Sequence, residues 1–383
     1  MITFASPKCV TYLSILLLLG ACAGLPVNGT VGGQVIETRV DSEVARYYVE
    51  NYLAGKRSDA LLDERIDRVY QSADGDLPNR DDLKKLSDDF SVDFAAVYLA
   101  DQIARVPVNR RFRTVFDQAY EYTRKAHSEG HVKLPTAAAN YEVLFVPTYL
   151  YKRITMTGAD MAVPRAALQK AGFSCYFVET QDDGAIESNA DLVVAAIRAR
   201  AQSGRRLIIV SASKSGPEVA LALTRMEPAE TGHVAAWINT VGALQGTPLV
   251  DDRLLPEIEF IVGKVDPAGM ESLTVARSRQ RFDSFRIPKH ILVVNYFGIP
   301  TIGSISFLGR RGFFLLRKYG PNDGLVLLPD MIFPGGVTLA QVGSDHIALN
   351  DHIDIAGVAL AITVVEWLEN ENHQVSPVPE SSP

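Results

Sequence analysis

Three features are scarce in this 383-residue chain: cysteine, positive charge and long apolar runs. Two of its three cysteines, Cys9 and Cys22, lie near the N-terminus, so Cys175 has no partner for an internal disulfide. Cys175 lies in an apolar run, which predicts a small buried side chain and not a reactive thiol. Acidic residues outnumber basic ones by 45 to 38, and this balance argues against a nucleic-acid partner.

The apolar run Tyr12–Leu19 is too short to span a bilayer comfortably and predicts the core of a signal peptide. The residues at its end, Leu19-Gly20-Ala21-Cys22, resemble the bacterial lipobox. The resemblance implies that residues 1–21 are removed and that Cys22 is lipidated, which would anchor the protein in the bacterial cell envelope. Ala23 stands where a retention aspartate would be, so the resemblance points to the outer membrane. Ordinary cleavage near Ala21 or Ala23 is the alternative.

In the rest of the chain, the composition and the pattern of apolar residues change from one region to the next. It divides into a Gly-rich tether (22–36), a helical region (37–134), a region of alternating short apolar strands and amphipathic helices (135–369) and a polar, disordered tail (370–383). Such alternation predicts an α/β domain with a mostly parallel sheet and helices on both faces. Residues 244–289 form an insertion too long for an ordinary connection, so we interpret it as a lid or cap.

Local patterns give approximate bounds for the elements of this domain. The predicted strands are 142–147, 175–179, 207–210, 234–241, 290–296 and 336–342, and the predicted helices are 163–171, 189–202 and 353–369, with 254–265 and 270–285 in the insertion.

The domain is organised around a corner at Ser213. The apolar run Leu207–Val210 passes through small residues directly into an amphipathic helix. A strand, a sharp turn with a central serine and a helix are typical of a nucleophile elbow, which needs small residues two positions before and after the nucleophile. Ser211 and Ser215 occupy these positions in place of glycine. A purely structural turn is the alternative, because Ser215 and Glu218 also match a capping box.

An acid and a histidine follow Ser213 in the order that this topology requires for acyl transfer. Asp323 comes after the penultimate strand, although Asn-Asp-Gly is also ordinary turn chemistry. His346 comes directly after the last strand, where the catalytic base is expected. With these residues, the chain from about Tyr141 to Leu368 resembles the α/β-hydrolase fold, nearest to bacterial lipases and esterases.

The resemblance implies a role for each residue. Ser213 would be the nucleophile, Asp323 the acid and His346 the base. The oxyanion hole would use the backbone N–H of Lys214 and one from Tyr149 or Thr148. The segment Asn239–Pro248 also resembles a lipase segment, whereas Val146–Tyr149 replaces the His-Gly of many relatives.

Other residues compete for these roles. Asp251 and Asp252 are rivals for the acid, and His352 is a rival for the base. His233 and His290 precede strands, which places them at the opposite edge of the sheet. His127 and His131 lie four residues apart, but no third ligand follows at metal-site spacing, so we predict no metal and no other cofactor.

The sequence therefore predicts a membrane-anchored serine hydrolase that cleaves small-molecule or lipid carboxylic esters. An acyltransferase or amidase with the same triad, and an inactive hydrolase fold acting as an envelope lipoprotein, are the alternatives. The segment Phe307–Tyr319 mixes aromatic and basic residues, which predicts either contact with acyl chains or lipid headgroups, or an ordinary amphipathic segment. The oligomeric state stays open.

Overall fold

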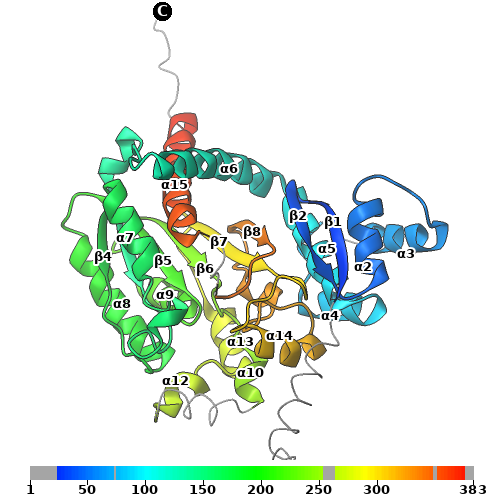
Figure 1. The fold of residues 1–383 in the computed structure, drawn as a ribbon. Helices are drawn as coiled ribbons and strands as arrows, with labels where there is room; N and C mark the ends of the chain where they lie inside the picture. The colour runs from blue at the N-terminus through cyan, green and yellow to red at the C-terminus, as the bar shows by residue number, and fades with distance from the viewer. Residues whose placement is uncertain (1–23, 73–74, 253–263, 348–351, 376–383) are drawn as a thin grey trace, which may run out of the picture.

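A six-stranded sheet forms the centre of the protein (Figure 1). The computed structural model describes residues 24–72, 75–252, 264–347 and 352–375. All pairs of neighbouring strands in this sheet are parallel. In spatial order the strands are β4 (Ser174–Phe177), β3 (Tyr141–Val146), β5 (Arg206–Ala212), β6 (Val234–Thr240), β7 (Leu292–Ile299) and β8 (Val337–Val342).

Helices cover both faces of this sheet, as predicted from the alternation of strands and helices. One face packs against α6 (Pro107–Ser128), α7 (Ala162–Ala171) and α15 (Ile353–Val375). The other packs against α8 (Ile186–Arg200), α9 (Ser215–Arg225) and α13 (Val275–Ser284). The central strands are mostly apolar because both of their faces are buried.

The predicted tether is wrong, because residues 25–40 form a β-hairpin. Strands β1 (Leu25–Val31) and β2 (Gln34–Val40) pair antiparallel, with Val31 opposite Gln34. Gly32 and Gly33 both have positive φ, as a two-residue hairpin turn requires. One face of the hairpin is buried. Because β2 continues to Val40, the region expected to be helical from residue 37 begins with a strand.

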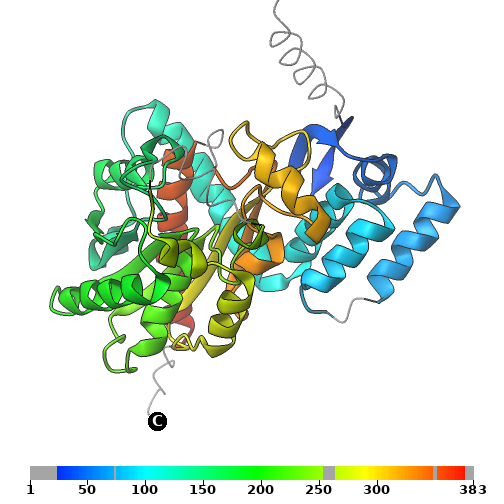
Figure 2. The same cartoon turned by 90° about the horizontal axis from the view of Figure 1, so that it is seen from below.

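Helices follow the hairpin and join it to the end of the sheet at β7 and β8 (Figures 1 and 2). They are α2 (Glu43–Tyr47), the π-helical turn η1 (Tyr48–Tyr52), α3 (Ala60–Gln71), α4 (Arg80–Asp89) and α5 (Val92–Arg105). Helix α5 is the centre of this region, because nearly all of its side chains between Val92 and Ile103 are buried.

Two other predicted boundaries shift. The predicted insertion helix 270–285 is divided into α12 (Pro267–Glu271) and α13, while most of 254–265 lies outside the described residues. Helix α15 continues to Val375, so residues 370–375 are helical and do not belong to the predicted disordered tail.

The predicted signal peptide and Cys22 lie outside the described residues. Among the residues that are described, no helix has both the length and the hydropathy needed to cross a membrane.

Buried polar contacts connect the N-terminal region to the segments on either side of α14 (Arg310–Leu316). The Asp93 carboxylate accepts hydrogen bonds from the backbone N–H groups of Asp41 (2.8 Å) and Ile302 (3.1 Å). Arg317 pairs with Asp41 at 2.6 Å and lies 3.8 Å from Asp93. Burial, with a smaller contribution from the charge of Asp41, raises the pKa of Asp93 from 3.8 to about 7.

This pKa predicts how stability depends on pH. Between pH 4 and 7 the folded protein keeps a proton on Asp93 that the unfolded chain releases, so the contribution of Asp93 is lost as pH rises through this window. In Asp93→Asn, the free energy of unfolding should fall less over the same range, by up to about 4 kcal/mol at about 1.4 kcal/mol per pKa unit. Urea unfolding at several pH values measures the difference. Glu37→Gln, an exposed change in β2, is the control, and parallel profiles for wild type and Asp93→Asn would contradict the prediction.

Candidate active site

Ser213 lies at the corner between β5 and α9 in a strained backbone conformation. Its φ of 53° lies in the left-handed region, which is uncommon for a residue other than glycine. The Ser213 N–H donates to the Thr240 carbonyl (3.0 Å), and the Ser213 carbonyl accepts from the N–H groups of Gly216 and Ala243. The surrounding chain therefore fixes this conformation, as expected for a functional corner.

The two serines that replace glycine around Ser213 have structural partners. Ser215 Oγ accepts from the Ala212 N–H (2.8 Å) and donates to the Val146 carbonyl (2.8 Å). Ser211 Oγ accepts from the indole N–H of Trp237 (2.8 Å). The predicted capping box is not formed, because no side chain caps the N-terminus of α9. These small hydroxyls fit the corner and also secure its backbone.

Asp323 and His346 are brought into direct contact. His346 Nδ1 lies 2.7 Å from Asp323 Oδ2, and the His346 backbone N–H donates to the Asp323 carbonyl (2.9 Å). The other carboxylate oxygen accepts from the N–H groups of Leu325 and Val326. Because a carboxylate only accepts, Nδ1 carries the hydrogen and Nε2 is free to act as a base.

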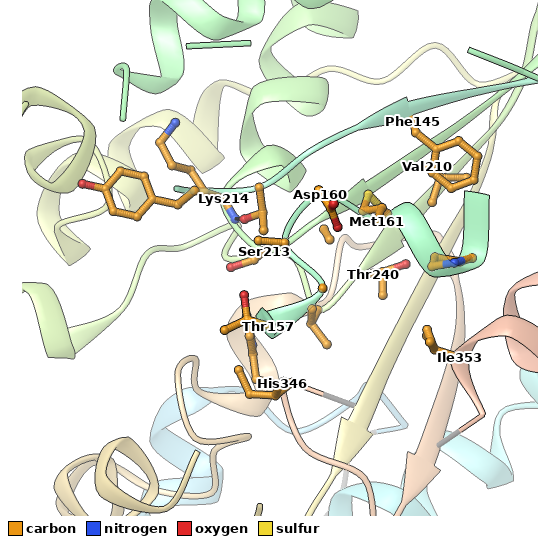
Figure 3. A pocket seen from close by; sticks show the side chains of 18 of the residues that line it. Phe145, Thr157, Asp160, Met161, Val210, Ser213, Lys214, Thr240, His346 and Ile353 are labelled. Carbon is orange, nitrogen blue, oxygen red and sulfur yellow. Dashed lines mark hydrogen bonds between the residues drawn. The ribbon is translucent and has the colours of Figure 1, made fainter. Parts of the chain in front are cut away.

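Ser213 and His346 line one cavity of about 850 Å³. In the described part of the chain, no hydrogen bond joins the Ser213 hydroxyl to the imidazole. In the view of Figure 3, the Thr157 side chain lies between the two. The structure thus joins Asp323 and His346 directly and places Ser213 and His346 on the same cavity.

The predicted oxyanion donors differ in their availability. The Thr148 N–H is used by the Ala159 carbonyl (3.1 Å), so Thr148 cannot contribute that group. The Lys214 N–H instead donates to the Thr148 hydroxyl (3.1 Å). Within the described residues the Tyr149 N–H has no acceptor, and both Tyr149 and Lys214 line the cavity. Of the three predicted donors, Tyr149 is thus the one whose N–H has no acceptor among the described residues, whereas the Lys214 N–H would have to exchange the Thr148 hydroxyl for another acceptor.

The residues that compete for the acid and base roles make other contacts or lie away from Asp323 and His346. Asp251 accepts from the Val275 N–H (3.3 Å), and Asp252 pairs with Lys318 (2.9 Å). His352 borders the cavity at the start of α15, but no contact with Asp323 is found for it in the described residues. As predicted, His233 and His290 lie at the far edge, bound to the carbonyls of Ile197 and Thr231.

The sequence analysis missed a buried ion pair beneath the corner. Lys214 and Glu218 form a salt bridge one helical turn apart, and both are only 1% exposed. Asn189 donates to the same Glu218 oxygen (2.9 Å). The spacing of four residues was visible, but a lysine directly after the nucleophile gave no signal that it would be buried. Its ammonium lies 6.0 Å from the centre of the Tyr149 ring.

Comparison with known proteins identifies the fold. No family model matches the chain, and no curated protein is similar enough in sequence to match. Among solved structures, the metagenomic carboxyl esterase MGS0156 is 20% identical, with a TM-score of 0.52 over 63% of this chain and 78% of the esterase. The Bacillus licheniformis lipase BlEst2 is also 20% identical, with a TM-score of 0.47 over 57% and 89%. The chain therefore has the predicted α/β-hydrolase fold.

The buried ion pair predicts a selective loss of stability. Lys214→Met should lower the free energy of unfolding by about 3–5 kcal/mol near pH 8, because Glu218 is then buried without a countercharge. Burial raises the pKa of Glu218, so the loss should shrink in acid as the carboxyl takes a proton. Urea denaturation near pH 8 and in acid measures the free energy of unfolding of each variant. The double variant Lys214→Met/Glu218→Leu should recover most of the loss; equal losses in the single and double variants would contradict the prediction.

Proposed function

We propose that this protein is a serine hydrolase that cleaves carboxylic esters, with Ser213 as nucleophile, His346 as base and Asp323 as acid. The observation that carries the proposal is the hydrogen-bonded pair Asp323–His346, whose histidine lines the same cavity as Ser213. The strained corner at Ser213 supports it independently. The neighbouring structures named above are an esterase and a lipase, in agreement with this reaction class.

The proposed reaction has two steps. His346 Nε2 takes the hydroxyl proton of Ser213 while the serine oxygen attacks the ester carbonyl, and the proton passes to the alcohol as it leaves. Water then attacks the acyl-enzyme with the same histidine as base, which releases the carboxylic acid. The Tyr149 and Lys214 N–H groups stabilise the oxyanion, each by about 3 kcal/mol. Asp323 holds the imidazole in the required tautomer and stabilises its cation.

Substitution of the triad tests the assignment. Ser213→Ala should abolish labelling by a fluorophosphonate probe and lower kcat on p-nitrophenyl butyrate by at least about 10⁴-fold. Asp323→Asn should lower kcat by about 10⁴-fold with the fold intact, because the imidazole loses its orienting partner. Ser128→Ala, at the exposed end of α6, is the control.

The outcomes separate this proposal from its rivals. Equal labelling of wild type and Ser213→Ala would refute the nucleophile. Absence of turnover by a folded wild-type protein would favour an inactive binding role. Transfer of the acyl group to an added alcohol in preference to water would identify an acyltransferase, and faster cleavage of amides than of esters an amidase.

Membrane attachment is part of the same proposal. Phe307, Leu308, Phe314 and Leu315 are exposed and form what we name the α14 apolar patch, with Arg310 and Arg311 among them. Gly24, the first described residue, approaches Ile302 on the connection leading to this patch. Cys22 lies two residues earlier, a reach of at most about 7 Å. A lipid on Cys22 and the α14 apolar patch would therefore approach the same membrane surface.

Vesicle binding tests the patch separately from the lipid. Protein comprising residues 24–383, prepared without acylation, should bind anionic vesicles, and Phe307→Ser/Phe314→Ser should weaken binding by at least about tenfold, because two aromatic side chains no longer enter the interface. Leu61→Ser, an equally exposed site on α3, is the control. Sedimentation with vesicles at low and high salt separates the apolar contribution of the aromatic side chains from the electrostatic contribution of the basic residues. Binding that is unaffected by salt would contradict a role for the basic residues.

A further inference from the structure

The cavity extends beyond the proposed catalytic residues into the layer between the sheet and two helices. Its inner wall is almost entirely apolar, with side chains from three strands and from helices α7 and α15. The residues that define this inner part are Phe145, Val210, Ile238, Leu168, Leu360 and Ala361. Figure 3 shows Phe145 and Val210 well to one side of Ser213, past Met161 and Thr240.

The burial of β5 shows how deep this space reaches. Leu207, Ile208 and Ile209 have no exposed surface, as expected for a central strand covered on both faces. Val210, on the same face as Ile208, is nevertheless only partly buried. Solvent-sized space therefore reaches Val210, and Ile208 forms the floor.

The depth sets the length of a ligand. Ser213 follows Val210 by three positions and lies just past the end of β5 at Ala212, so at most about 10 Å of chain separates the two residues. An extended alkyl chain with bonds of about 1.5 Å advances about 1.25 Å per carbon. A straight chain of about eight carbons, with its carbonyl at Ser213, would therefore fill the space as far as Val210.

Charge restricts the chemistry of this ligand. Lys214 is the sole lysine or arginine among the described residues that line the cavity, and its ammonium is paired with Glu218. Asp160 adds an acidic group on the wall. The cavity thus offers no unpaired guanidinium or ammonium group for a phosphate or second carboxylate, whereas its apolar wall suits an uncharged hydrocarbon chain.

We propose that the space between Ser213 and Val210 is an acyl-chain subsite, which makes the preferred substrates esters of straight, medium-chain acids of about eight carbons. This inference rests on the proposed function only for the position of the carbonyl. The walls from β5 and α15 select chain length, while the alcohol part of the ester lies outside this space.

A series of p-nitrophenyl esters from acetate to myristate tests the subsite in the full-length protein. The value of kcat/KM should rise by up to about fourfold for each added methylene as far as octanoate and then level off or fall. Val210→Phe should move the optimum to butyrate or shorter and lower activity on octanoate at least tenfold, with activity on acetate retained. Val210→Ala should move the optimum to longer chains. Leu192→Phe, exposed on α8, should leave the profile unchanged.

A binding measurement keeps this test separate from catalysis. Octanoic acid should bind to Ser213→Ala in calorimetry and should bind at least tenfold more weakly to Ser213→Ala/Val210→Phe. Binding of this kind without ester hydrolysis by the wild type would overturn the proposed function and leave the subsite. Hydrolysis with no dependence on chain length, and no effect of either substitution at Val210, would overturn the subsite and leave the proposed function. Circular dichroism and thermal melting confirm that each variant is folded.

Discussion

The backbone strain at Ser213 is the constraint on which the site depends. A left-handed conformation costs a residue with a β-carbon on the order of 1 kcal/mol or more, so it persists only where neighbours determine it. Here the determinants are long-range: β3, β6 and the chain after β6 all hydrogen-bond to the corner or to its flanking serines. The corner thus becomes rigid only when the central strands are assembled. The contacts that assemble the sheet are therefore also the contacts that hold the proposed nucleophile in place.

The proposed acid and base are held in a different way. Asp323 and His346 lie in two loops that bind each other through main chain and side chain, and backbone N–H groups fix the second carboxylate oxygen. Thr247, at the start of the insertion, donates to the Leu325 carbonyl (2.6 Å) beside this pair. The N-terminal region supports the same part of the molecule from outside, since Arg80 pairs with the buried Asp330. The N-terminal region thereby supports the segment that follows Asp323, the proposed acid.

Much of the fold was predictable because buried parallel strands have a strong local signature. The strands of the sheet and the order Ser213, Asp323, His346 could be derived from apolar runs and their ends. The hairpin at residues 25–40 could not, because a Gly-rich stretch suggested flexibility, although Gly32-Gly33 between alternating valines is also a hairpin signal. The buried pair Lys214–Glu218 and the use of the Thr148 N–H by Ala159 depend on contacts between distant segments, which periodicity does not encode.

The alternation of side chains along β5 gives the two faces of this strand different roles in the site. Successive residues of β5 point to opposite faces, so Ile208, Val210 and Ala212 face α7 and α15, while Ile209 and Ser211 face α8 and α9. The first set forms a wall of the cavity, and Ser211 braces the corner through Trp237. Ser213 comes directly after the end of the strand, where the alternation stops and the chain turns. Changes on the cavity face can therefore alter ligand fit without touching the hydrogen bonds that hold Ser213, whereas changes on the opposite face act on the corner itself.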